Sequence, residues 1–181
     1  MADKSQAKRA MIEAGVPCVP GYHGDAQDSR TLATEAAKIG FPILIKAAAG
    51  GGGRGMRLVT KEEDLQDAIA AAKSEALNAF GADELILEKA IIRPRHIEIQ
   101  IFGDSQGNII YMGERDCSIQ RRYQKIIEEA PCNIMTTKLR QEIGKVAVTA
   151  AAAVDYVGAG TVEFLLDEDL NFYFLEMNTR L

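Results

Sequence analysis

A run of glycines follows a lysine that stands within an apolar stretch. The segment KAAAGGGGRGM runs from Lys46 to Met56, and five of the six residues from Gly50 to Gly55 are glycine. Glycine inside a regular element costs roughly 0.5–1 kcal/mol relative to alanine, so the run must serve something other than stability. Backbone N–H groups of such a loop can bind phosphate oxygens. We therefore expect a glycine tip over phosphates, with Lys46 as a phosphate ligand; a tip without a ligand is the alternative.

The glycine run fits the pattern G-x-G-x-x-G, but its surroundings do not suit a dinucleotide fold. That pattern binds a pyrophosphate only where a strand leads into a helix. Here residues 41–48 and 55–59 both read as strands, and no helix is expected before Thr60. The Gly-Lys-Ser/Thr end of a P-loop does not follow either. The sequence therefore predicts a hairpin tip, and a lysine that extends its amine into solvent is the alternative for Lys46.

Two glutamates and an asparagine near the C-terminus fall where a hairpin would bring them together. Residues 161–178 read as two strands around the turn DEDLN, so paired residue numbers sum to about 339. Glu163 then lies opposite Glu176, with Asn178 on the same face. Opposed like charges destabilise a sheet, and a divalent cation between them would remove the conflict. These oxygen ligands suit Mg²⁺ or Mn²⁺, while two solvated glutamates are the alternative.

Periodicity and capping signals predict the elements that carry these residues. Helices are expected at 3–14, 28–40, 60–81 and 136–156, the third opened by a capping box of Thr60 and Glu63. Strands are expected at 41–48, 55–59, 84–89, 95–104, 108–114 and within 161–178, and residues 118–131 are expected to be extended. The strand at 95–104 alternates between an apolar face, Ile97, Ile99 and Ile101, and a polar face, His96, Glu98 and Gln100.

Composition excludes several classes of protein. The 181 residues are 47% hydrophobic and 26% charged, as in soluble globular proteins. A net charge of −5 argues against a nucleic-acid binder, and the longest apolar stretch, 146–154, is too short to span a membrane. Cys18, Cys117 and Cys132 lack the spacing of disulfides or metal ligands, so free thiols in a reducing compartment are expected.

A polar extended stretch adds positive charge to this acidic protein. Within ERDCSIQRRYQK the cations are Arg115, Arg121, Arg122 and Lys125. Together with a candidate metal and phosphate site, they suit anionic substrates. Arg121 and Arg122 would point to opposite faces of a strand, so at least one of them is expected to be structural. A charged surface strand is the alternative.

Taken together, these segments resemble the ATP-grasp enzymes, and within them biotin carboxylase. The resemblance rests on AGVPCVPG, GFPILIKAAAGGGGRGMR, LEKAI, PRHIEIQIFGD, GERDCSIQRR, EEAP, GAGTVEFL and FLEMNTR, in the family's order from Asp3 to Leu181. It implies an α+β fold of mainly antiparallel sheets with packed helices. Residues 1–17 would be a linker helix, 18–90 the ATP-grasp lid, and 91–181 the first half of the C-terminal ATP-grasp domain. The sequence stops directly after a strand, so we expect a cut fragment that is inactive alone.

The resemblance also implies a role for individual residues. Nucleotide contacts would come from Lys4, Lys46, Gly52, Gly53, Glu88, Lys89, Ala90, Ile91, His96, Tyr123, Glu163 and Glu176. The metal ligands would be Glu163, Glu176 and Asn178, the trio that the hairpin register also brings together. Lys125 would contact bicarbonate, and Arg180 would hold bicarbonate and stabilise the charge that develops on biotin. Tyr123 stands where the family usually has histidine, and a phenol cannot become a cation near neutral pH.

The implied reaction has two steps. ATP phosphorylates bicarbonate to carboxyphosphate, which then carboxylates biotin on a carrier protein. The implied partners are ATP with Mg²⁺ or Mn²⁺, bicarbonate, the biotinylated carrier and a carboxyltransferase component, but no nucleic acid or membrane. The parent would be a homo-oligomer in the cytoplasm or, in a eukaryote, the mitochondrial matrix. Another ATP-grasp carboxylate–amine ligase and a non-catalytic nucleotide-binding fragment are the alternatives.

Overall fold

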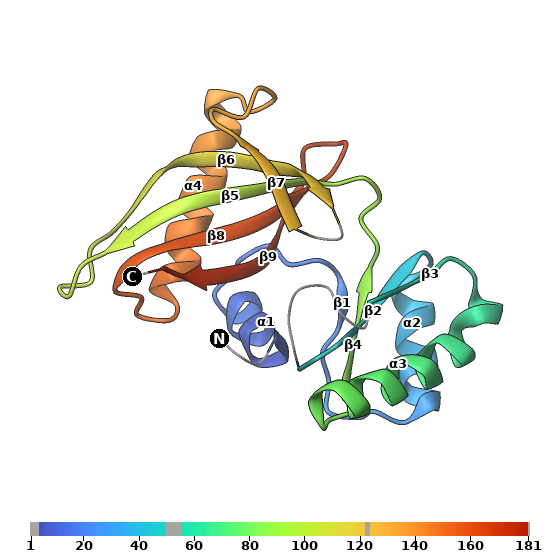
Figure 1. The fold of residues 1–181 in the computed structure, drawn as a ribbon. Coiled ribbons are helices and arrows are strands. Elements are labelled where there is room, and N and C mark those ends of the chain that lie inside the picture. The colour runs from blue at the N-terminus through green and yellow to red at the C-terminus, as the bar shows by residue number, and fades with distance from the viewer. Residues whose placement is uncertain (1–3, 50–55, 122–123, 181) are drawn as a thin grey trace. The chain divides into compact units, whose positions relative to one another are not determined.

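The computed structural model describes residues 4–49, 56–121 and 124–180 (Figure 1). Its helices are α1 (Lys4–Glu13), α2 (Ser29–Ile39), α3 (Leu65–Phe80) and α4 (Thr137–Ala152), with a 3-10 turn, η1 (Glu62–Asp64). Its strands are β1 (Gly21–Tyr22), β2 (Ile43–Ala47), β3 (Arg57–Val59), β4 (Leu85–Lys89), β5 (Arg95–Gly103), β6 (Ile109–Arg121), β7 (Gln124–Glu129), β8 (Gly158–Leu166) and β9 (Phe172–Thr179). No helix within these ranges is long and apolar enough to cross a membrane.

Contacts divide the chain into two compact units. The first comprises residues 1–9 and 19–90, and the second comprises residues 10–18 and 91–181. Each contains an antiparallel sheet with helices, so the expected α+β class is confirmed. The assignment of 1–17, 18–90 and 91–181 as linker, lid and C-terminal half stays a prediction.

The first unit is a four-stranded sheet with strand order β1-β4-β2-β3, packed against α2 and α3. Ile43 and Ile45 of β2 lie in its apolar core, together with Leu87 of β4 and residues of both helices. Successive residues of a strand point to opposite faces. Lys46 and Glu88 therefore point to the face opposite this core, which places them on one side of two paired strands.

The second unit is a five-stranded sheet with strand order β7-β6-β5-β8-β9. Helix α4 packs on one face through Ile143, Ala147 and Ala150, which meet the predicted apolar face of β5. The polar face of β5 is therefore directed away from α4 and carries His96, Glu98 and Gln100, as the alternation predicted. This second face also carries Glu163, which lies opposite Glu98 in the neighbouring strand β8.

A β-bulge sets the register of the β8–β9 hairpin. Near the turn, Leu166 pairs with Phe172 and Phe164 pairs with Phe174, but Glu163 pairs with Glu176. One extra residue on β9, Leu175, therefore shifts the ladder by one position. The predicted pairing of Glu163 with Glu176 is confirmed, although the sequence did not reveal the bulge that produces it.

Two helix boundaries differ from the sequence prediction. The capping box of Thr60 and Glu63 is wrong, because residues 62–64 form η1 and α3 begins only at Leu65, without a side-chain cap. The carboxylate of Glu63 instead lies 3.1 Å from Nζ of Lys61. Helix α4 was expected to reach Tyr156 but ends at Ala152, and Asp155 beyond it adopts a positive φ of 47°.

The polar stretch 118–131 contains a chain reversal that the sequence analysis missed. Strand β6 continues for 13 residues to Arg121, and β7 pairs with it antiparallel, with Arg121 opposite Gln124. Near the start of β6 the register shifts, where Gly113 has a φ of 109° that few other residues adopt. The reversal folds Lys125 back beside β6, where the sequence alone gave no position for it.

Replacing Phe164 by alanine should destabilise the second unit. Phe164 is fully buried and packs edge-to-face on Phe172 and Phe174, at centroid distances of 5.8 and 6.4 Å. Truncation of a buried phenylalanine costs about 3–5 kcal/mol. Urea unfolding followed by tyrosine fluorescence should show this loss, whereas Ile110→Ala, at an exposed position of the same sheet, should change the unfolding free energy by less than about 0.5 kcal/mol. Equal effects of the two variants would contradict this packing.

Candidate functional site

Lys46 meets a buried carboxylate in the first unit. Its Nζ forms an ion pair with Oε2 of Glu88, and Nζ of Lys8 lies 2.9 Å from Oε1 of the same group. Lys8, Lys46 and Glu88 are only 5%, 9% and 3% exposed. Burial by itself raises the pKa of Glu88, but Lys46 and then Lys8 outweigh it and lower that pKa to about 2. The solvated alternative for Lys46 is therefore wrong, and Glu88 is ionised at neutral pH.

His23 lies near this charged group with an unpaired side chain. Neither ring nitrogen has a hydrogen-bond partner within the described residues, although His23 is only 9% exposed. Burial lowers the pKa of His23, Glu88 opposes this, and the neighbouring cations lower it further. The imidazole is therefore neutral at pH 7 and cannot serve as a third cation for Glu88.

The segment expected to contact adenine is tied into the fold. Nζ of Lys89 donates to the carbonyls of Gly40 and Phe41 at 3.0 and 2.8 Å. The N–H of Lys89 donates to Pro20 at 2.8 Å, and the N–H of Ala90 donates to Pro42 at 3.0 Å. In this conformation both N–H groups are used within the protein, so they are not available to a base edge. Ile91, the next residue in the chain, already belongs to the second unit.

Four predicted nucleotide contacts lie outside the described part of the chain. They are the side chain of Lys4, the loop residues Gly52 and Gly53, and Tyr123. Their roles stay predictions from the family resemblance.

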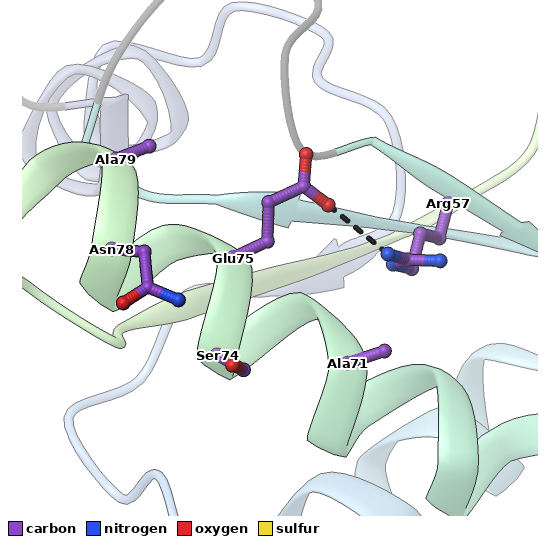
Figure 2. Close-up of a pocket in the computed structure, with 6 residues that line it drawn as sticks. All are labelled: Arg57, Ala71, Ser74, Glu75, Asn78 and Ala79. Atoms are coloured by element: carbon purple, nitrogen blue, oxygen red, sulfur yellow. Dashed lines mark hydrogen bonds and ion pairs between the residues drawn. The ribbon is translucent and has the colours of Figure 1, made fainter.

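A shallow hollow on the first unit is lined by none of the predicted site residues. Figure 2 shows its lining, which comes from β3 and α3 and consists of Arg57, Ala71, Ser74, Glu75, Asn78 and Ala79. Nη2 of Arg57 lies 3.0 Å from Oε2 of Glu75, so the two charged groups of the hollow pair with each other. Exposed pairs of this kind contribute little, and they leave no unbalanced charge for a ligand.

A row of charged residues crosses the sheet of the second unit. Glu98 on β5 lies opposite Glu163 on β8, and Glu163 lies opposite Glu176 on β9. Arg115 on β6 lies opposite Glu98 and begins the row. Residues directly opposite each other in neighbouring strands share a face. Three carboxylates therefore stand in line on the face that α4 leaves uncovered, and we call them the glutamate row.

Lys125 neutralises the first two members of the glutamate row. Its Nζ lies 2.5 Å from Oε2 of Glu98 and 2.6 Å from Oε1 of Glu163, and both glutamates are 2% exposed. Nε of Arg115 donates to the remaining oxygen of Glu98 at 2.5 Å. Lys125 was predicted as a bicarbonate contact, and in this structure it is the counter-ion of two buried carboxylates.

These contacts shift the pKa values of the groups involved. Burial raises the pKa of Glu98, but hydrogen bonds from Lys125 and Arg115 outweigh it, so the net pKa is lowered. Burial likewise raises the pKa of Glu163, and hydrogen bonds from His96 and Lys125 reverse the shift. Burial lowers the pKa of Lys125, but its bonds to Glu163 and Glu98 raise it overall. All three groups are therefore charged at neutral pH.

His96 orients the second oxygen of Glu163. Its Nε2 lies 2.5 Å from Oε2 of Glu163, and its Nδ1 lies 2.8 Å from Nε2 of Gln120. The Gln120 nitrogen also donates to the carbonyl of Cys117 at 2.8 Å, which fixes the amide orientation. Since an amide nitrogen can only donate, Nδ1 accepts from Gln120, and Nε2 is the nitrogen that donates to Glu163.

The open end of the row is formed by β9. Nδ2 of Asn178 donates to Oε1 of Glu163 at 2.7 Å, which confirms that Asn178 shares the face. Glu176 is exposed, and its side chain has no hydrogen bond or ion pair with any described residue. Arg180 follows β9, is exposed, and donates from Nη2 to Oγ1 of Thr161 at 3.4 Å. The predicted metal trio is thus brought together, but both oxygens of Glu163 are already engaged.

The sequence analysis missed Glu98, Arg115 and Gln120 as members of this network. The alternation of β5 put Glu98 on the polar face, but nothing local shows that β5 pairs with β8. Gln120 acts through His96, and its position depends on the fold of β6. For Arg115 and Gln120 the signal was the density of charge in ERDCSIQRRYQK, which does not tell which charges pair.

One other group of potential metal-binding atoms occurs among the described residues and does not suit a metal. It combines Glu98, Cys117 and Glu128. Both oxygens of Glu98 are held by Lys125 and Arg115, and burial raises the pKa of the Cys117 thiol to about 12. A cysteine binds metal as the thiolate, which this environment disfavours. The three cysteines are free, as expected.

The sequence matches a known family over nearly its whole length. Residues 3–181 match the family described as carbamoyl-phosphate synthase L chain, ATP binding domain. The mitochondrial methylcrotonoyl-CoA carboxylase subunit alpha of Dictyostelium discoideum is 56% identical over 181 residues, all of this chain and 26% of that protein. The chloroplastic biotin carboxylase 1 of Populus trichocarpa is 54% identical over all of this chain and 34% of that protein.

Solved structures show the same fold. A biotin carboxylase from Campylobacter jejuni in a beta-gamma-ATP complex superposes with a TM-score of 0.94 at 54% identity, covering all of this chain and 41% of that one. The biotin carboxylase domain dimer of Hydrogenobacter thermophilus 2-oxoglutarate carboxylase, with MgADP, ADP and bicarbonate, gives 0.93 at 50% identity over 40% of its chain. The chain thus spans between about a quarter and two fifths of these relatives.

Removing the Lys125 charge should destabilise the second unit in a pH-dependent way. In Lys125→Met the buried carboxylates of Glu98 and Glu163 lose a shared hydrogen-bonded cation, worth about 1.5–3 kcal/mol. Both glutamates have lowered pKa values, so their contribution is present above the ordinary carboxylate pKa and is lost as pH falls through the lowered values. The variant should therefore differ most from the native protein near neutral pH and least in acid.

Urea unfolding at about pH 7.5 and at about pH 3, below the ordinary carboxylate pKa, measures this difference. Adding Glu98→Gln to Lys125→Met should recover part of the loss at neutral pH, because one of the unpaired charges is removed. Lys138→Met, in an exposed pair 3.8 Å from Glu142, is the matched control and should have little effect. A loss from Lys125→Met that is the same at both pH values would contradict the proposed charge balance.

Proposed function

We infer that this chain, which belongs to the carbamoyl-phosphate synthase L chain ATP-binding domain family, is an ATP-binding part of a biotin carboxylase. The relatives named above include biotin carboxylases and a methylcrotonoyl-CoA carboxylase subunit. Because the chain spans only part of their length, the whole reaction belongs to the proposal. The observation that carries it is the glutamate row, which ends in Glu176 beside Asn178, an oxygen-rich site open on one side.

A divalent cation fits the open end of the row. Glu163, Glu176 and Asn178 would hold it, since two carboxylates and an amide oxygen on one face are the hard ligands that Mg²⁺ prefers. When bound with ATP, the cation would supply positive charge to the phosphates. Asn178 would have to turn its amide oxygen toward the site, because its nitrogen now faces Glu163. Manganese, also an oxygen-seeking ion, is the second candidate.

Lys125 is placed to change partners when Glu163 is used as a ligand. It holds Oε1 of Glu163 and Oε2 of Glu98 simultaneously, so it keeps one carboxylate partner if it leaves the other. After leaving Glu163, the ammonium group of Lys125 could contact an anion such as bicarbonate, and its remaining ion pair with Glu98 would keep it charged. His96 and Gln120 hold the other oxygen of Glu163 in place.

The remaining assignments follow the family resemblance. Lys46 would bind a phosphate of ATP, and Arg180 would hold bicarbonate and the charge that develops on biotin. The biotinylated carrier, a carboxyltransferase component and a homo-oligomeric parent are proposed as partners. The compartment would be the cytoplasm or, because several relatives are named as mitochondrial proteins, the mitochondrial matrix.

Glu176→Gln should weaken the binding of ATP in the presence of Mg²⁺. The side chain is exposed and unpaired among the described residues, so its replacement should leave the fold intact. We expect the MgATP dissociation constant to rise about tenfold or more, since 1.4 kcal/mol corresponds to a factor of ten. ATP without a divalent cation should bind the variant and the native chain equally, and isothermal titration calorimetry measures both.

Glu142→Gln, which removes an exposed carboxylate on α4, is the control and should bind MgATP normally. In a longer protein that contains this chain, ADP release should depend on bicarbonate and not on an amino acid. Absence of MgATP binding by the native chain, or an unchanged dissociation constant in Glu176→Gln, would contradict the proposal. ADP release that requires an amino acid instead of bicarbonate would favour a carboxylate–amine ligase.

A further inference from the structure

Glu88 forms ion pairs with two lysines, although one lysine would be enough to neutralise its charge. Lys46 from β2 pairs with Oε2, and Lys8 from α1 lies 2.9 Å from Oε1. The two cations thus occupy different oxygens, so that either can leave without breaking the contact of the other. All three side chains are buried, and a buried carboxylate left without a cation is strongly disfavoured.

The two lysines differ in how they are placed. The Lys46 side chain is 11% exposed, against 6% for Lys8, and Lys46 is the one that the proposed function directs to a phosphate. A phosphate that takes Lys46 would remove one of the cations that keep Glu88 ionised. The third titratable group facing Glu88 is His23, which is buried and whose ring nitrogens have no partner among the residues that the structure describes. Arg9 is engaged by the His23 carbonyl and by Asp25.

We propose that Lys8 is a positioning residue for nucleotide binding: it stays on Glu88 as the resident cation and thereby allows Lys46 to move to a phosphate. This inference rests on the proposed function, because it requires that Lys46 contacts ATP. Lys8 itself touches no phosphate in this account. Its effect should appear only with ligands that draw Lys46 away from Glu88.

Without Lys8, a nucleotide that takes Lys46 would leave Glu88 unpaired in the protein interior. The carboxylate would then take up a proton, because a buried carboxyl without a cation favours its neutral form. MgATP binding by Lys8→Met should therefore be weaker by about tenfold to a hundredfold, the range for one lost charge-assisted hydrogen bond. It should also be linked to proton uptake and become tighter as pH falls, which the native chain should not show.

Isothermal titration calorimetry in two buffers of different ionisation enthalpy measures affinity and proton uptake together. The native chain and Lys8→Arg should bind MgATP with no net uptake near pH 7, whereas Lys8→Met should take up close to one proton. Adenosine, which has no phosphate, should bind Lys8→Met and the native chain equally. A merely structural defect would weaken both ligands. Lys61→Met, which removes an exposed pair with Glu63 in the same unit, is the matched control and should change neither value.

Adding Glu88→Gln to Lys8→Met should abolish the proton uptake, because no carboxylate remains to be protonated. Should Lys8→Met fail to fold, Lys8→Gln removes the charge but keeps a hydrogen-bond donor, and the same comparisons apply. If Lys8→Met or Lys8→Gln binds MgATP with native affinity and without proton uptake, the proposed role of Lys8 is wrong, while the proposed function is unaffected. Failure of the native chain to bind MgATP would overturn the proposed function, and this inference with it.

Discussion

The glutamate row on the second sheet is the constraint that the rest of the site must satisfy. Antiparallel pairing of β5, β8 and β9 places Glu98, Glu163 and Glu176 directly beside one another, and like charges in that arrangement repel. The fold offsets this repulsion by the reversal of the chain into β7, which brings Lys125 between the first two carboxylates. The third, at the exposed edge, has no counter-ion among the described residues, and so the repulsion is left there for a ligand to relieve.

The first unit manages buried charge in a related way. Glu88 is held by two lysines from different elements, just as Lys125 is held by two glutamates from different strands. In both cases an ion with two partners of opposite charge can give up one of them without becoming unpaired in a medium of low dielectric constant.

The sequence predicted what depends on local pattern. Alternation identified the two faces of β5, and the hairpin around DEDLN placed Glu163 opposite Glu176. It could not show the pairing of β5 with β8, because contacts between residues 65 positions apart leave no periodic signal, and Glu98 was therefore missed. The 3-10 turn before α3 was missed for a different reason. Thr60 and Glu63 fit the capping pattern, but the Glu63 carboxylate pairs with Lys61, two residues away, and α3 begins without a side-chain cap.

The ionisation of Glu163 tests the central claim most directly, because the account requires this buried carboxylate to remain charged through Lys125 and His96. Carboxyl ¹³C chemical shifts of a glutamate-labelled sample, followed from acid to neutral pH, report its titration midpoint. The account predicts a midpoint below the ordinary glutamate value in the native chain, in accord with the lowered pKa of Glu163, and an upward shift in Lys125→Met. A native midpoint at or above the ordinary value, or one that Lys125→Met leaves unchanged, would contradict it.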